Sequence, residues 1–357
     1  MTELEYILDA WPMLRGKGPD VWATFAHVLL DKGKGVEAFT LALAAHEHPD
    51  CGNRDRALAR FVLNAGVPGW HWDLVRDKAR NAAYETALRR VVRSDSLVLD
   101  IGAGTGLLGL LALRAGAGHV VSCEMNPSTA RMAAVIARAN GVADRLRIIS
   151  KKSTDLILGS DLERPADVIV SEIVDNTLLA EETLLTHRDA VPRLLQPSGH
   201  VIPGDGAIMV ALGHDPTLVH RRMGMHEGFD LSAFNILASA SYKVPVGTPG
   251  LHLLTQPVPL FEFAFDKPGS WPGNLADVDV TVQAGGTANS IIQWIRLTLD
   301  RSGVEGSVYE AKPGPGRKSC WAAMSWPLNT PLALTAGENR RIAGRRTDSK
   351  VTIWLAD

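Results

Sequence analysis

Apolar and polar residues change their spacing along the chain, and these changes divide it into three regions. In the first region, apolar positions recur at helical spacing over residues 22–49, with a break between Gly33 and Gly35. A weaker helical pattern follows over residues 53–63. We therefore expect residues 1–66 to form a helical extension.

The middle region, residues 67–203, alternates short apolar runs with helical periodicity, which is typical of a parallel sheet covered by helices. The pattern predicts strands over residues 97–101, 119–123, 146–150 and 167–171. It predicts a proline-marked entry followed by a long helix over residues 67–88, and further helices over residues 107–114, 128–140 and 183–195. This region should form a Rossmann-like α/β domain.

From Gly204 onward, short alternating apolar stretches separated by glycine and proline favour β structure. The pattern predicts strands over residues 277–282, 291–300, 321–326, 332–334 and 351–355. We expect residues 204–357 to form a β-barrel or sandwich beside the sheet. The segment 218–254, which contains GFDLSAFN, should extend away from that domain. The expected fold class is thus α/β, with a Rossmann-like domain followed by a β-barrel domain.

Charge and cysteine content narrow the possible function classes. The formal net charge is −2, so no basic surplus indicates nucleic acid or an anionic membrane as a partner. Cys51, Cys123 and Cys320 lie far apart and match neither a disulfide framework nor a metal-binding pattern, so we expect no metal site. The first residues lack a secretory signal pattern, and no apolar run reaches membrane-spanning length. These features predict a cytoplasmic protein.

The turn after the first strand of the middle region carries the first chemical signal. Its sequence, DIGAGTG at residues 100–106, places Asp100 before the first glycine. A carboxylate is unfavourable beside the pyrophosphate of a dinucleotide, which the G-x-G-x-x-G pattern binds. It suits S-adenosylmethionine, which carries an ammonium and a sulfonium group and no phosphate. Glu124, after the second strand, is placed to accept the ribose hydroxyls. The stretch predicts an S-adenosylmethionine-dependent methyltransferase; a dehydrogenase and a purely structural glycine turn are the alternatives.

Two glutamates carry the second chemical signal. Glu172 directly follows the fourth predicted strand, and Glu181 follows a mostly apolar or small segment. Open α/β sheets bind their ligands at this edge. Two carboxylates that converge in a partly dry cleft repel each other unless a cation lies between them. A guanidinium group fits because its planar fork matches carboxylates bidentately, although a solvated acidic surface is the alternative.

These motifs resemble the protein arginine methyltransferase family. DIGAGTG resembles the family's cofactor motif, SEIVDNTLLAE at residues 171–181 its double-glutamate loop, and HWDLVRDKARN at residues 71–81 its cofactor-lid helix. SCWAAMSWPLNTPLALTAGE at residues 319–338 resembles its Thr-His-Trp loop and the strands that follow. The resemblance covers residues 67–357, and the helical N-terminus is similar to the divergent, repeat-bearing branch of the family.

The resemblance implies the composition of the site. Glu172 and Glu181 would grip a substrate guanidinium, with Asp77 supporting them from the lid helix. Further substrate contacts would come from Ser319, Cys320 and Trp321. The residues implied for S-adenosylmethionine are His71, Leu74, Arg80, Asp100, Gly102, Gly104, Glu124, Met125, Ser153 and Thr154.

One position departs from the family pattern. Cys320 stands where the family has a histidine that pairs with the lid aspartate, and a thiol does not carry that positive charge. The departure implies either that a glutamate or water takes the proton released in the reaction or that Asp77 is held differently. The resemblance also places a dimerisation arm at GFDLSAFN, so it implies a homodimer.

The N-terminal extension resembles one tetratricopeptide repeat, because GKGVEAF, Ala42-Leu43 and Pro49 fall where that repeat places such residues. One repeat does not bury its own apolar face, so we expect it to pack on the catalytic domain or on a partner subunit. A generic helical cap is the alternative.

Three functions remain open at this stage. The chain has a bacterial-looking composition and resembles bacterial relatives that methylate free L-arginine in natural-product biosynthesis, and it lacks the strong acidity that would attract basic protein tails, so free L-arginine is favoured. Methylation of arginine in a protein or peptide is the first alternative. The second, of another class, is a catalytically weak adaptor that uses the helical repeat, which the change at Cys320 allows.

Overall fold

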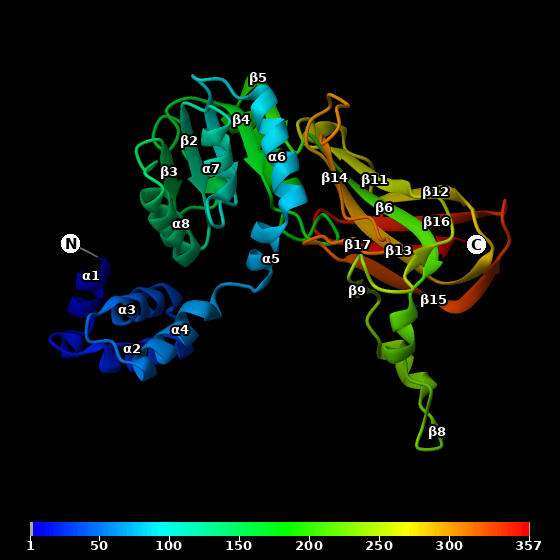
Figure 1. Ribbon diagram of the computed structural model, residues 1–357, viewed down its shortest axis with the longest axis horizontal. Coiled ribbons are helices and arrows are strands. Elements are labelled where there is room, and N and C mark those ends of the chain that lie inside the picture. Colours follow the sequence, from blue (N-terminus) through cyan, green and yellow to red (C-terminus); the bar gives the residue numbers. More distant parts are fainter. Residues whose placement is uncertain (1–2, 357) are drawn as a thin grey trace.

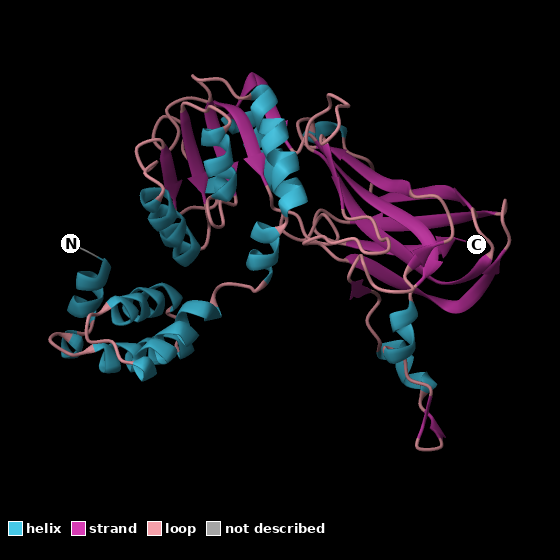
Figure 2. Ribbon diagram, viewed as in Figure 1, coloured by secondary structure: helices cyan, strands magenta, loops and turns pink. Residues whose placement is uncertain are grey.

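The structure, a computed structural model, describes residues 3–356 and has three parts along the chain (Figure 1). A small helical unit comes first and is followed by a parallel sheet with helices. The C-terminal part is built from antiparallel strands and carries a narrow projection (Figure 2). The predicted α/β fold class, with a β-barrel-like domain after the Rossmann-like domain, is confirmed. Within the described residues, no helix combines the length and the apolar character needed to cross a bilayer.

The helical unit consists of α1 (Glu3–Ala10), α2 (Pro19–Asp31), α3 (Gly35–Glu47) and α4 (Asn53–Ala65), with a short 3-10 turn at Pro12–Leu14. The four helices enclose a core of their own, which includes Ala23, Ala26, Leu29, Leu41 and Val62. The premise that this segment does not bury an apolar face by itself is therefore wrong, although the expected packing on the sheet domain is found. The unit also touches the sheet domain, because α3 packs on α8 and Arg131 pairs with Glu3. Its likeness to a tetratricopeptide repeat stays a prediction.

The sheet domain contains five parallel strands in the order β3-β2-β1-β4-β5. They are β1 (Leu97–Ile101), β2 (His119–Cys123), β3 (Leu146–Ile149), β4 (Ala166–Ser171) and β5 (Leu195–Ile202). Val98 on the central strand pairs with Val120 and Val168, so apolar side chains line up across the sheet. The covering helices include α7 (Leu107–Arg114), α8 (Pro127–Ala139) and α9 (Thr183–Leu194).

The entry to the sheet domain is not the single helix predicted over residues 67–88. The structure has α5 (Trp70–Arg76) and α6 (Lys78–Val91), which meet at Asp77. The backbone of Asp77 is extended, and its carboxylate accepts the N–H of Arg80 at 2.9 Å as the cap of α6. A short acidic side chain at a helix start stabilises the break, because it satisfies a backbone donor that has no helical partner. The break turns α5 toward the C-terminal edge of the sheet.

The C-terminal domain has a seven-stranded sheet and a three-stranded sheet. In the larger sheet, neighbouring strands follow the order β10-β6-β13-β15-β9; in addition, β11 pairs with β6 and β14 pairs with β13. The smaller sheet has the order β12-β16-β17. The strands are β6 (Asp205–His214), β9 (Tyr242–Val244), β10 (His252–Leu253), β11 (Val258–Ala264), β12 (Leu275–Thr281), β13 (Gly286–Thr298), β14 (Val308–Glu310), β15 (Ala323–Leu334), β16 (Asn339–Arg346) and β17 (Val351–Ala356). The strands predicted over residues 321–326 and 332–334 are one strand, β15. Phe261, Phe263, Phe265 and Trp294 are fully buried in the core.

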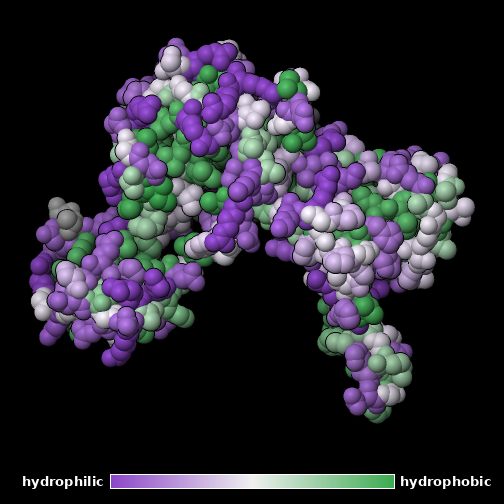
Figure 3. Space-filling model, in the orientation of Figure 1, coloured by the Kyte–Doolittle hydropathy of each residue, from purple (hydrophilic) through white to green (hydrophobic). Residues whose placement is uncertain are grey.

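A projection leaves this domain between β6 and β9 (Figure 1). It contains the 3-10 turns Pro216–His220 and Ser232–Leu237, with a small hairpin of β7 (Met225–His226) and β8 (Phe229–Asp230) between them. Its exposed side chains include Met225, Phe229, Phe234, Ile236 and Leu237. Figure 3 shows green and pale spheres together with purple ones on this projection, which reaches out from the barrel. Exposed apolar residues gathered on one element are a common feature of interaction surfaces.

Candidate active site

A pocket of about 480 Å³ lies at the C-terminal edge of the parallel sheet. Open α/β sheets bind ligands at this edge. The pocket is walled by α5, the turn after β1, the end of β2 and the loop after β4. Of the residues predicted for the site, the pocket is lined by His71, Leu74, Arg80, Gly102, Gly104, Glu124, Met125, Ser153, Glu172 and Glu181.

The turn after β1 brings backbone to the pocket wall. Gly102 and Gly104 have φ angles of 78° and 52°, in the left-handed region that side chains disfavour. A Cβ atom on Gly102 would lie 2.6 Å from Cγ2 of Ile173, so this turn and the loop after β4 approach more closely than a larger residue permits. The glycines therefore join two walls of the pocket.

Asp100 lies beneath this turn rather than in the pocket lining. It is fully buried and accepts a hydrogen bond of 2.9 Å from Ser122 Oγ, while its Oδ1 has no partner among the described residues. Burial raises the pKa of Asp100 to about 6, although the Ser122 hydroxyl acts in the opposite direction. Its carboxylate thus places negative potential behind the glycine turn.

Glu124 follows β2 and is held by two backbone donors. Gly104 N–H donates to Oε2 at 3.0 Å, and Asn126 N–H donates to Oε1 at 2.8 Å. These contacts fix the carboxylate at the pocket wall next to Met125. Ser153 is buried in the same wall. Thr154 is exposed and lies outside the pocket lining, so the structure does not bring it to the predicted site.

The pocket does not have the charge that a pyrophosphate needs. Lys151 and Lys152 reach its wall, but they pair with Asp161 at 2.8 Å and Glu182 at 2.5 Å. Asp100 and Glu124 add negative charge near the glycine turn. The charges around the pocket therefore fit a cationic nucleoside without phosphate, such as S-adenosylmethionine, better than a dinucleotide.

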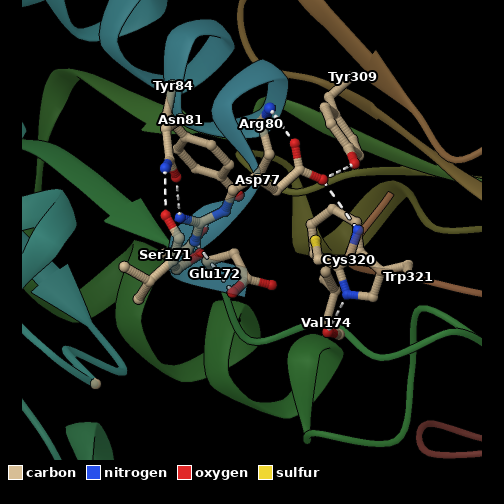
Figure 4. Close-up of polar contacts among 12 residues, drawn as sticks. Asp77, Arg80, Asn81, Tyr84, Ser171, Glu172, Val174, Tyr309, Cys320 and Trp321 are labelled. Carbon is tan, nitrogen blue, oxygen red and sulfur yellow. Dashed lines mark hydrogen bonds and ion pairs between the residues drawn. The ribbon is translucent and has the colours of Figure 1, made fainter. Parts of the chain in front are cut away.

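The loop after β4 carries the two predicted glutamates (Figure 4 shows Glu172). Glu172 is buried, and its Oε2 lies 3.1 Å from Nη2 of Arg80. Burial raises the pKa of Glu172 to about 8, while the Arg80 guanidinium acts in the opposite direction. Glu181 lines the same pocket but is exposed to solvent, and its partial burial raises its pKa to about 7. Both acids therefore line one pocket with a strong demand for positive charge.

Arg80 is held from several directions. Its guanidinium donates to Asn81 Oδ1 at 2.8 Å as well as to Glu172, and it lies 4.9 Å from the centre of the Tyr84 ring. The Tyr84 hydroxyl donates to the carbonyl of Ser171 at 3.0 Å, so α6 is tied to the end of β4 (Figure 4). Nε of Arg80 is buried with no partner among the described residues. The sequence motifs did not identify Tyr84, although its aromatic side chain lies four residues after Arg80.

The C-terminal domain braces the glutamate loop. Trp321 Nε1 donates to the carbonyl of Val174 at 3.1 Å, and Ala322 N–H donates to Asn176 Oδ1 at 2.6 Å. Gln293 on β13 donates to the carbonyl of Asn176 at 2.9 Å. The sequence motifs pointed to Trp321 but missed Asn176 and Gln293. These contacts fix the path of the loop that connects Glu172 with Glu181.

Asp77 connects the lid to the barrel. Its Oδ1 accepts the N–H of Arg80, and its Oδ2 accepts the hydroxyl of Tyr309 and the N–H of Cys320, the latter at 3.0 Å (Figure 4). Burial alone would raise the pKa of Asp77, but these donors outweigh it and hold the pKa below its usual value. Burial also raises the pKa of the Cys320 thiol, so the group stays neutral. Tyr309, which the sequence motifs missed, is the side chain that meets Asp77 from β14.

The structure thus brings two acidic groups and a lid to one edge of the sheet. Asp77 and the predicted barrel residues Ser319, Cys320 and Trp321 lie behind the pocket lining rather than in it. No cluster of three metal-ligating side chains occurs in residues 3–356. The arrangement can hold one cation between carboxylates beside a second ligand on the glycine turn.

Comparison with known proteins finds methyltransferases similar to different parts of the chain. Residues 85–204 match the family model described as ribosomal protein L11 methyltransferase (PrmA). An arginine N(omega)-methyltransferase from Streptomyces achromogenes subsp. streptozoticus is 36% identical over 279 residues, which cover 78% of this chain and 76% of that protein. A protein arginine N-methyltransferase 7 from Anopheles gambiae is 31% identical over 65% of this chain, a match that spans 37% of its own length.

Solved structures show the same fold. The Trypanosoma brucei PRMT1 enzyme-prozyme heterotetrameric complex with AdoHcy contains a chain with a TM-score of 0.67 and 23% identity, and the match covers 78% of this chain and 87% of that one. Arabidopsis thaliana protein arginine methyltransferase 10 has a TM-score of 0.64 and 17% identity, covering 77% and 86% of the two chains. At these identities the likeness concerns the arrangement of the two domains.

Proposed function

Because this chain belongs to the arginine N-methyltransferase family, we propose that it methylates a terminal guanidino nitrogen of free L-arginine. The observation that carries the proposal is the pair Glu172 and Glu181, two carboxylates with raised pKa values in one pocket. A substrate guanidinium between them would relieve their demand for positive charge. The cofactor of this enzyme class is S-adenosylmethionine, which supplies an electrophilic methyl group on its sulfonium when bound.

We assign the cofactor to the residues around the glycine turn. Glu124 would accept the ribose hydroxyls, and Arg80 would pair with the cofactor carboxylate, for which its unpartnered Nε leaves capacity. Asp100 would favour the cationic methionine end through its charge. His71 and Leu74 on α5 would close over the pocket, and further contacts would come from Gly102, Gly104, Met125 and Ser153.

Glu172 and Glu181 would make the substrate nitrogen reactive. A free guanidinium stays protonated, and its nitrogens are poor nucleophiles because their lone pairs are delocalised. Two carboxylates that bind two of the nitrogens draw positive charge toward themselves, which leaves more electron density on the third. They also hold that nitrogen in line for attack, and alignment with charge neutralisation accounts for most of the rate. The nitrogen would form a bond to the methyl carbon as the bond between that carbon and the sulfonium sulfur breaks, and it would lose a proton. Glu181 would take this proton and pass it to solvent, to which its side chain is exposed.

The Streptomyces relative supports free arginine over protein-bound arginine, because its name specifies arginine and its match extends over most of both chains. The test is incubation with methyl-labelled S-adenosylmethionine and either L-arginine or an arginine-rich protein extract, followed by separation of small molecules from protein. We expect the label in Nω-methylarginine. Label in the protein fraction with none in the amino acid would support the alternative that the Anopheles relative exemplifies. A role in natural-product biosynthesis is part of the same proposal.

The projection would serve as the dimerisation arm. It exposes Phe234, Ile236 and Leu237 together at the end of the β6–β9 connection, which a second copy of the chain would cover. Sedimentation velocity should show a dimer for the wild-type protein and a monomer for the Ile236→Asp variant. A wild-type monomer at micromolar concentration would contradict the proposed homodimer.

A further inference from the structure

We propose that Tyr309 is a positioning residue for the reaction, whose hydroxyl fixes the Asp77 carboxylate as an anion between the lid and the barrel wall. The inference rests on the proposed function, because it concerns the same site. Tyr309 does not line the pocket of about 480 Å³ and so does not act on the ligands directly. It acts through Asp77.

The position of Tyr309 leads to this assignment. It lies on β14 and is 6% exposed, and its ring packs edge-on against Trp321 with centroids 5.3 Å apart. Its hydroxyl donates to Asp77 and also lies 2.9 Å from Ser319 Oγ. Ser319 Oγ accepts the N–H of Trp321 at 3.0 Å. One hydroxyl therefore stands where the lid helix, β14 and the Ser319–Trp321 turn meet.

The two oxygens of Asp77 have separate tasks. Oδ1 caps α6 through the N–H of Arg80, and Oδ2 faces the barrel, where it meets Tyr309 and Cys320. The cap keeps the start of α6 in place, and Arg80, three residues on, contacts Glu172. A contact that turns Oδ2 toward the barrel therefore also sets the position of the pair Arg80–Glu172. The same wall holds the glutamate loop through Trp321 Nε1.

The Tyr309 hydroxyl that donates to Oδ2 of Asp77 carries no charge. A hydroxyl that donates to a carboxylate keeps it ionised without cancelling its charge. Burial raises the pKa of the Tyr309 phenol, so the hydroxyl keeps its proton at neutral pH and remains a donor to Asp77. Asp77 therefore keeps its negative charge at the start of α6, where its other oxygen caps the helix.

The first test is Tyr309→Phe in the full chain, because phenylalanine keeps the ring that packs on Trp321 and removes the hydroxyl. We expect kcat/KM for arginine to fall about 10-fold, the scale of one hydrogen bond to a charged group. Most of the change should be in kcat rather than in the KM for arginine, because Tyr309 sets the geometry of the site and does not line the pocket. Tyr242→Phe on β9 is the matched control, with unchanged kinetics expected.

A double-mutant cycle with Asp77→Asn separates positioning from packing. Asparagine is also a good helix cap, so this variant should keep α6 and weaken the same contact from the other side. If Tyr309 acts through Asp77, Tyr309→Phe should change kcat/KM less than about 2-fold in the Asp77→Asn background. Thermal melting curves of all variants serve as the control that each variant folds.

The outcomes are distinguishable from a failure of the proposed function. Wild-type turnover of arginine with equally fast turnover by Tyr309→Phe would overturn this inference and leave the proposed function intact. Losses that multiply in the double variant would also overturn it, because the two groups would then act independently. A wild-type protein that binds S-adenosylmethionine but does not methylate arginine would overturn the proposed function and this inference with it.

Discussion

The change Glu181→Gln tests the electrostatic basis of the site with the least structural disturbance. Glu181 lines the pocket, and no cationic side chain among the described residues forms an ion pair with it. Glu172, in contrast, is bound to buried Arg80. Removing the charge of Glu172 would leave Arg80 unpaired in the interior, which costs about 3–5 kcal/mol of stability. Glutamine at position 181 keeps the size of the side chain and one acceptor oxygen, so the variant should fold normally.

The expected magnitude follows from Coulomb's law. Opposite unit charges about 4 Å apart interact by about 4 kcal/mol at an effective dielectric constant of about 20. Glu181 is partly exposed, so solvent screening reduces this to about 2–3 kcal/mol. One factor of ten corresponds to about 1.4 kcal/mol, and kcat/KM for arginine should therefore fall roughly 50-fold.

The assay measures initial rates of Nω-methylarginine formation by mass spectrometry over a range of arginine concentrations. Affinity for S-adenosylhomocysteine, measured by calorimetry, and the melting temperature should stay near wild-type values. Glu163→Gln, the same chemical change at an exposed position before β4, is the control and should change kcat/KM by less than about 2-fold. A Glu181→Gln variant that turns over arginine at the wild-type rate would refute the reasoning.

Three further results follow from the structure. Gly102→Ala should abolish cofactor binding, measured by calorimetry, because the new Cβ would lie 2.6 Å from the side chain of Ile173. The control is Gly33→Ala, which is also at positive φ but has open space around it; it should cost about 1–2 kcal/mol of stability and leave binding unchanged. The kcat/KM for arginine should rise with pH and level off above about pH 8, because Glu181 and Glu172, with pKa values of about 7 and about 8, must be ionised to hold a cation; a flat profile from pH 6 to 9 would contradict this. Burial lowers the pKa of His187 to about 4, so between about pH 6.5 and 4 the unfolded chain binds a proton that the folded chain does not. The protein should therefore lose about 3 kcal/mol of stability as the pH falls through this range. Urea titrations of His187→Gln should show a smaller loss.

The parts of the fold that the sequence predicted have strong local patterns. The strand at Leu97–Ile101, the glycine turn and the strand at His119–Cys123 appear where the apolar runs and glycines place them. In contrast, β5 has the sequence LQPSGHVI, whose proline and glycine hide a strand that the neighbouring β4 stabilises. The break at Asp77 was missed because helical periodicity continues on both sides of it.

The candidate site shows the same division. Residues within motifs, such as Glu124 and Glu172, lie at the pocket, because each follows a strand of the parallel sheet. The residues that brace them were not visible in the sequence. Gln293 and Tyr309 belong to no motif, and Asn176 lies inside the double-glutamate motif without being singled out by it; the importance of all three comes from contacts between the two domains. Thr154 shows the converse, because a position assigned by resemblance lies on the surface outside the pocket lining.

A crystal structure with S-adenosylhomocysteine and L-arginine bound tests the central claim most directly. We expect the guanidinium between Glu172 and Glu181, with its nitrogens about 2.7–2.9 Å from oxygens of both carboxylates and one terminal nitrogen aimed at the cofactor sulfur. Arginine bound elsewhere, or held by one acid while the other turns to solvent, would contradict the account.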